Sequence, residues 1–152
     1  MGVRWGHADI IVGDMEAMAA FYNRLGVPIA TPPAEWAPHH RNSGSQEGWD
    51  VDLDSQQFAA IWNKGWPGGP GVVLVFRVDT RDEVDRIFGD LTAAGHAPQQ
   101  PPYDAFWGSR FAVITDPDGN AVGVMSAPDE AYKTAPPPPP FDAPEGSVIP
   151  SG

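Results

Sequence analysis

The sequence predicts an α+β domain over residues 1–127, built from two successive βαβββ units. Two segments repeat one helical spacing of apolar residues, i, i+3, i+7 and i+10, and each lies between a β-rich run and extended, turn-punctuated sequence. Residues 128–152 differ, because they are rich in proline and cannot form a core of their own. We expect one unit at about 4–66, a second at about 71–127, and a proline-rich tail whose deletion leaves the fold intact.

The two predicted helices are defined by their ends as well as by their spacing. The apolar positions are Met15, Met18, Tyr22 and Leu25 in the first helix and Val84, Ile87, Leu91 and Ala94 in the second. Each pattern is followed by a glycine, Gly26 or Gly95, suited to left-handed backbone at a helix end. Asp14 can cap the first helix, and Thr80 with Glu83 predicts a capping box for the second.

Extended segments surround both helices. Strands are expected at 8–12, 27–30, 38–42 and 49–53 in the first unit and at 72–78, 97–100, 110–115 and 121–125 in the second. The segment Asp116-Pro-Asp-Gly-Asn120 joins the last two strands. Pro117 fixes φ at the second turn position and Gly119 can adopt a positive φ, so this segment predicts a tight hairpin turn without a catalytic role.

Composition and charge exclude several classes of function. The net charge is −11, and 9 Lys+Arg against 20 Asp+Glu leave no basic surface for nucleic acid. The absence of cysteine excludes disulfides, thiolate chemistry and sulfur-ligated zinc. We find no signal peptide and no apolar run near the roughly 20 residues that span a bilayer. A soluble, cytoplasmic protein that binds neither nucleic acid nor membrane is expected.

Both units also carry more specific motifs. The first has His7-Ala-Asp-Ile-Ile-Val12, Asp14, Phe21-Tyr22 and Leu25-Gly26, and the second has Phe76-Arg-Val-Asp79, Phe106-Trp107-Gly108 with Arg110, and Asp116-Pro-Asp-Gly-Asn120. Together they resemble the glyoxalase/bleomycin-resistance/extradiol-dioxygenase superfamily, the vicinal oxygen chelate (VOC) family, over about residues 4–127. The resemblance implies a curved mixed sheet of eight strands, with a ligand cavity on its concave face and the helices on its convex face. It also implies a homodimer.

Strand alternation within that fold selects the side chains expected in the cavity. In the first strand Trp5, His7 and Asp9 would face it, and in the fourth strand Asp50 and Asp52 would do so while Trp49 joins the core. Arg110 is expected as the only nearby cation, either paired with an aspartate or holding an anionic group. The expected ligand-binding residues are Trp5, His7, Asp9, Asp52, Phe106, Trp107 and Arg110.

The resemblance also bears on metal binding. Metal-dependent members place ligands, typically His and Glu, on the first and fourth strands of each unit. His7 stands at the first of these positions, but Val72 or Val73 and Gly123 stand at two others. Asp52, or less well Asp50, could fill the remaining one. Because catalytic sites normally keep three protein ligands, we expect no metal cofactor, with His7 and Asp52 as weak candidates should a site exist.

His39 and His40 form a second histidine motif on the predicted third strand. Adjacent strand residues point to opposite faces, so both cannot easily join one cluster, although one of them could complete a metal site with His7 and Asp52. A polar, partly exposed pair is the expected arrangement.

Three functions remain open at this point. The preferred one is a metal-free small-molecule-binding protein resembling the bleomycin-resistance branch, whose members sequester a drug in an acidic, aromatic-rich dimer. The six tryptophans and the charge of −11 favour it and predict a planar, cationic ligand. The second is an enzyme, either a lyase, isomerase or dioxygenase with a rearranged metal site or a metal-free catalyst using His7 and Asp52 as acid and base. The third is a scaffold whose proline-rich tail docks on a partner.

Overall fold

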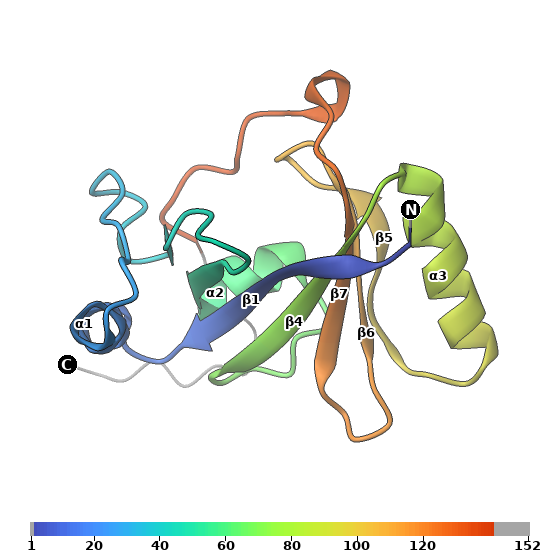
Figure 1. Cartoon of the computed structure of the whole chain (residues 1–152), viewed down its shortest axis with the longest axis horizontal. Coiled ribbons are helices and arrows are strands. Elements are labelled where there is room, and N and C mark those ends of the chain that lie inside the picture. The colour runs from blue at the N-terminus through green and yellow to red at the C-terminus, as the bar shows by residue number, and fades with distance from the viewer. Residues whose placement is uncertain (1, 142–152) are drawn as a thin grey trace.

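The computed structural model describes residues 2–141 and contains a seven-stranded mixed sheet (Figure 1). The strands are β1 (Arg4–Val12), β2 (His40–Asn42), β3 (Val51–Ser55), β4 (Gly71–Val78), β5 (Pro98–Asp104), β6 (Arg110–Thr115) and β7 (Ala121–Ser126). The helices are α1 (Met15–Leu25), α2 (Gln56–Trp62), α3 (Arg81–Ala93) and the 3-10 helix η1 (Glu130–Tyr132). Within the described part of the chain, no helix is both long and apolar enough to cross a membrane.

The strand order is β2-β3-β1-β4-β7-β6-β5, and it reflects the two predicted units. Each unit pairs its first strand in parallel with its last, β1 with β3 and β4 with β7. The antiparallel pair of β1 and β4 joins the units at the centre of the sheet. The predicted α+β fold of two tandem units is therefore confirmed.

The helix ends form as their residues predict. The Asp14 side chain accepts a hydrogen bond from the Ala17 backbone N–H at 3.0 Å, and Thr80 and Glu83 form the full capping box of α3. Gly26 ends α1 with φ of 108°, a left-handed conformation that costs glycine little. Asp116 accepts hydrogen bonds from the backbone within its turn, so the predicted hairpin is also present.

Two small cores on one face of the sheet hold α1 and α3. Met15 and Ala19 of α1 pack with Val12 and Leu53, as alternation along β1 and β3 predicts. Val84 of α3 packs in the same way on the second unit, so both predicted helices cover the convex face. The larger core lies on the opposite, concave face and contains the alternate residues of the same strands, including Ile11, Val73, Val75, Phe111 and Val113.

An unpredicted helix, α2, belongs to that concave core. Ser55 caps it by accepting a hydrogen bond from the Phe58 N–H at 3.1 Å. Phe58, Ala59 and Trp62 then place one face of this short helix against the core. The expectation that helices occupy only the convex face is incomplete for this reason.

One predicted strand, residues 27–30, is absent, so the expected eight strands are seven among residues 2–141. The Asn23 side chain explains the difference, because its amide binds both the N–H and the carbonyl of Ile29, at 2.8 and 3.3 Å. These bonds satisfy the backbone locally instead of in a ladder. Trp49 is also misplaced by the sequence prediction: β3 begins at Val51, and Trp49 is 38% exposed rather than part of the core.

The first part of the proline-rich tail packs back on the domain. The Asp129 N–H donates to the Gly108 carbonyl at 3.0 Å, and the Thr134 N–H donates to the Phe106 carbonyl at 2.9 Å. Phe141 stacks on Phe58 with ring centroids 5.6 Å apart. The expectation that the tail leaves the fold unaffected takes no account of these contacts; residues 142–152 lie outside the described part.

Candidate functional site

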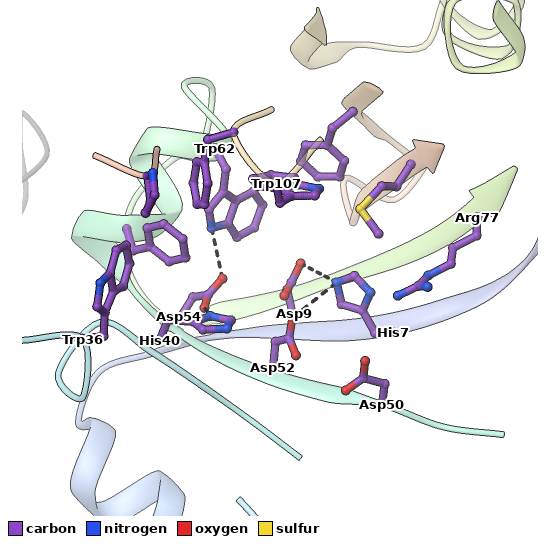
Figure 2. Close-up of a pocket in the computed structure, with 15 residues that line it drawn as sticks. His7, Asp9, Trp36, His40, Asp50, Asp52, Asp54, Trp62, Arg77 and Trp107 are labelled. Atoms are coloured by element: carbon purple, nitrogen blue, oxygen red, sulfur yellow. Dashed lines mark hydrogen bonds and ion pairs between the residues drawn. The ribbon is translucent and has the colours of Figure 1, made fainter. Parts of the chain in front are cut away.

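The concave face holds a cavity of about 410 Å³. Its apolar wall consists of Trp36, Phe58, Trp62, Phe106, Trp107, Phe111, Met125 and Pro136, and its polar lining consists of His7, Asp9, His40, Asp50, Asp52, Asp54 and Arg77. Most of the polar residues come from β1 and β3, whereas the aromatic residues come from α2, from the loops and from the second unit (Figure 2). The cavity therefore has one charged side and one aromatic side.

His7 lies between two carboxylates on the charged side. Its Nε2 is 3.2 Å from Asp9 Oδ2 and 3.6 Å from Asp52 Oδ2, and Asp9 and Asp52 are direct neighbours across the β1–β3 pair. Burial on its own lowers the pKa of His7, but the hydrogen bond to Asp9 and the two negative charges outweigh it and raise the pKa to about 9. Burial and the adjacent Asp9 raise the pKa of Asp52. The two carboxylates therefore favour the protonated, imidazolium form of His7.

A second imidazole–carboxylate pair lies beside the first. His40 Nδ1 is 2.5 Å from Asp54 Oδ1, and Trp62 Nε1 donates to Asp54 Oδ2 at 3.0 Å. Burial lowers the pKa of His40, but the hydrogen bond and charge of Asp54 raise it to about 9. Burial raises the pKa of Asp54 to about 6 against the opposing effect of His40. The buried Asp54 therefore has both a hydrogen-bond partner and a compensating charge.

Three polar groups of the lining have no hydrogen-bond partner among the described residues. These are Arg77 Nε, Trp107 Nε1 and His7 Nδ1, and all three atoms are buried. Buried donors in native proteins are nearly always paired, so unpaired donors around a cavity indicate groups that a ligand or water satisfies.

The second unit supplies an apolar surface where the resemblance implies metal ligands. Val73 is fully buried in the concave core. A Cβ at Gly123 would lie 3.0 Å from Phe111 and 3.1 Å from Val75, so no carboxylate side chain fits there without moving Phe111. The ligand set that spans both units of metal-dependent members is therefore not reproduced.

The first unit nevertheless offers a different set of donors. One ligand atom each of His7, Asp9 and Asp52 lie within 4.8 Å of one another, close enough to hold a single cation. Asp9 was predicted to face the cavity but not as a metal ligand. His40 is paired with Asp54 instead, so it does not complete this set.

Five of the seven expected ligand-binding residues line the cavity, and two do not. Those in the lining are His7, Asp9, Asp52, Phe106 and Trp107. Trp5 is 44% exposed because a β-bulge at Gly6 places it opposite Phe76 on the outer face. Arg110 lies outside the cavity, where it binds Asp85 and Asp104, at 3.0 and 3.2 Å. Of the two alternatives for Arg110, the structure shows the pairing with an aspartate.

Sequence reasoning missed several lining residues. The prediction that Arg110 is the only cation near the cavity is wrong, because Arg77 lines the cavity. Strand alternation could have identified Arg77, since it lies on the same face of β4 as the buried Val73 and Val75. His40 points to the cavity, whereas the His39 ring lies near Ser55 and Phe141, so the two do face different ways. Strand alternation does not apply to Trp36 and Trp62, because they lie on a loop and on the unpredicted α2.

Comparisons with known proteins place the fold in a family. The family model of the Glyoxalase/Bleomycin resistance protein/Dioxygenase superfamily matches residues 4–124. No curated protein matches the sequence significantly. Because the family match covers most of the chain, the protein belongs to this superfamily, which confirms the resemblance derived from its motifs.

Solved structures with the same fold include proteins of different activity. NAD-dependent benzaldehyde dehydrogenase from Legionella pneumophila matches with a TM-score of 0.56 and 23% identity, over 78% of this chain and 96% of that one. A variant of homoprotocatechuate 2,3-dioxygenase from B. fuscum matches with a TM-score of 0.58 and 17% identity, over 82% of this chain and 32% of that one. A mutant 4-hydroxymandelate synthase from Streptomyces coelicolor matches with a TM-score of 0.55 and 19% identity, over 82% of this chain and 38% of that one. These identities support the shared fold and not a shared activity.

Proposed function

We propose that this protein is a metal-free binding protein for a small planar molecule, and that it sequesters its ligand in the concave cavity. The observation that carries the proposal is the composition of the cavity, in which aromatic rings surround a volume of about 410 Å³. This volume lies within the range of small-molecule sites. The specific form of this function that we propose is drug sequestration, and through it antibiotic resistance, because bleomycin resistance proteins belong to the same superfamily.

The charged side of the cavity favours a positive group on the ligand. Two of its four aspartates, Asp9 and Asp54, form hydrogen bonds with His7 and His40. Asp50 has no ion pair among residues 2–141, and Asp52 is 3.6 Å from the same imidazole that Asp9 binds. The two imidazoles therefore compensate part of the negative charge that the sequence suggests, and a cation would be recognised mainly by Asp50 and Asp52.

Ligand binding can be tested with matched planar compounds and tryptophan fluorescence. We expect a planar cation to bind more tightly than its neutral isostere, and its affinity to fall as salt approaches ~1 M, where the Debye length is about 3 Å. Trp107→Ala should remove much of the fluorescence response, because this ring lines the cavity. Trp49→Ala is the matched control, since Trp49 is not part of the lining. Equal binding of the cation and the neutral isostere would contradict the charge preference.

A second candidate function, a metal-dependent enzyme of the same superfamily, is favoured by one observation. His7, Asp9 and Asp52 could hold a divalent cation through one nitrogen and two oxygens. We place it second because the second unit contributes no ligand, with Val73 and Gly123 at the two implied positions.

Metal content distinguishes the two candidates. We expect purified protein to contain no stoichiometric Mn, Fe, Co, Ni or Zn after exhaustive dialysis, measured by elemental analysis. About one equivalent per chain, lost in His7→Gln, would put the enzyme first. The native mass of the same sample tests the homodimer, which remains part of the proposal. The exposed Val72 and Leu74, on the face of β4 opposite the cavity, offer an apolar surface for such contact.

A further inference from the structure

The strongest unassigned feature of the cavity is the guanidinium of Arg77. This residue belongs to β4, and its side chain extends along the cavity face beyond His7, at the end opposite Trp36 (Figure 2). Its path depends on Gly6 in the neighbouring bulge, because a Cβ at Gly6 would lie 3.0 Å from Arg77 Cγ and 2.7 Å from the Val75 carbonyl oxygen. The sequence therefore keeps a space open for this arginine.

Arg77 differs from the other arginines whose side chains pack on the domain. Arg41 binds Glu16, Arg81 binds Asp104, and Arg110 binds Asp85 and Asp104. Among residues 2–141, Arg77 has no ion pair within 4.0 Å, and its buried Nε has no hydrogen-bond partner. An unpaired guanidinium with a buried donor is costly unless an acceptor satisfies it.

A second unpaired donor lies in the same lining. Trp107 Nε1 is buried without a partner, whereas Trp62 Nε1 donates to Asp54 and Trp66 Nε1 donates to the Gly69 carbonyl. In Figure 2 the Trp107 ring lies between Trp62 and Arg77. His7 Nδ1 is a third unpaired atom of this end of the cavity. These groups come from three separate segments of the chain and line one cavity.

We propose that Arg77 and Trp107 form an oxyanion subsite, so that the ligand carries a carboxylate or similar anionic group in addition to a planar body. Arg77 supplies paired N–H donors that match a carboxylate, and Trp107 supplies a single indole N–H. The positive group of the ligand faces Asp50 and Asp52, and the aromatic rings hold its planar part. This inference rests on the proposed binding function and specifies an amphoteric ligand class.

The test compares one planar cation with an analogue that carries an added carboxylate. Calorimetric titration of the full-length protein should show the analogue binding roughly 10-fold to 100-fold more tightly, the effect of a hydrogen bond to a charged group. Arg77→Met should abolish this gain, whereas the parent cation should bind at least as tightly as before, because the substitution removes a positive charge from the lining. Trp107→Phe, which keeps an aromatic ring but removes the N–H, should reduce the gain. Arg110→Met is the matched control, because its guanidinium binds Asp85 and Asp104 outside the cavity.

Each outcome is decisive for one of the two claims. If both compounds bind but Arg77→Met lowers neither affinity, water satisfies the guanidinium and the subsite is wrong, while the binding function stands. If neither compound binds, the proposed function fails and this inference fails with it. Should Arg77→Met not fold, Arg77→Lys keeps a charge without the planar pair of donors and should retain only part of the gain.

Discussion

Removing residues 128–152 is expected to lower the free energy of unfolding by about 2 kcal/mol and to open the cavity. The deletion removes Pro136 from the lining, and it removes Phe141, whose ring centroid lies 5.6 Å from those of Trp36 and Phe58. It also removes the cation–π contact of Arg81 with Tyr132, at 3.6 Å. Urea unfolding followed by tryptophan emission measures both effects, since Trp36 and Trp107 would become more exposed to solvent.

Two further proteins make this experiment specific to the tail contacts. A chain that ends at residue 141 keeps every described contact of the tail and should not show the loss of stability that deletion of residues 128–152 causes. Gly108→Ala should reproduce part of the deletion, because Gly108 has φ of 96° and a Cβ there would lie 2.7 Å from the Asp129 carbonyl oxygen. If the chain ending at residue 127 unfolds at the same urea concentration as the full chain, the packing of the tail contributes nothing to stability.

The elements of the fold could be predicted wherever a local pattern determines the structure. Both long helices have amphipathic spacing, side-chain caps and a terminal glycine, and all of these agree with one another. The prediction of a strand at 27–30 is wrong for a local reason that the apolar pattern does not show. The Asn23 amide forms hydrogen bonds with the backbone of Ile29, which would otherwise pair in a ladder. Helix α2 has only seven residues, too short for periodicity to distinguish it from a strand.

The site was predictable only as far as strand alternation holds. Alternation placed His7, Asp9 and Asp52 correctly, but it fails across the bulge at Gly6, which turns Trp5 outward. Along β6, the buried Phe111 and Val113 face the concave core, so Arg110 and Ala112 face the other way. Strand alternation applied to β6 and β4 therefore predicts Arg77, and not Arg110, as the arginine that lines the cavity.

The remaining lining residues depend on long-range packing. Trp36, Trp62 and Pro136 come from a loop, a short helix and the tail, and they meet only because Phe58 and Phe141 bring these segments together. No spacing in the sequence relates positions so far apart. The proline-rich composition correctly excludes an independent core for the tail, but it does not exclude packing on the core of the domain.

Stability is expected to fall steeply as the pH rises from about 6.5 to about 9. The cause is the pair of buried imidazoles, His7 and His40, whose pKa values are raised to about 9 in the folded protein. Unfolded histidine has a pKa near 6.5, so between these values the folded state binds more protons, and each further rise in pH favours the unfolded state. Below pH 6.5 both states are protonated and the stabilisation is fully present.

The size of this effect follows from proton linkage. A pKa raised from 6.5 to about 9 corresponds to about 3 kcal/mol for a single imidazole, a large part of the 5–15 kcal/mol that typically stabilises a domain. The groups that determine it are Asp9 and Asp52 around His7, with Arg77 acting in the opposite direction, and Asp54 beside His40. Burial also raises the pKa of Asp54 to about 6, so its ionisation adds a further loss of stability between pH 4 and 6.

Urea unfolding at several pH values and constant ionic strength measures this dependence. The double variant His7→Gln/His40→Gln should lose most of the decline between pH 6.5 and 9. His39→Gln is the matched control: burial lowers the pKa of His39, so its contribution has the opposite sign and lies below pH 6.5. A stability that stays level or rises from pH 6.5 to 9 would show that the two imidazoles are not held as cations in the folded protein. If both were already neutral at pH 6.5, raising the pH would remove no favourable charge interaction with their carboxylates. The charged side of the cavity would then carry Asp9 and Asp54 as uncompensated negative charges, and its preference for a cationic ligand would be stronger than the imidazole–carboxylate pairs imply.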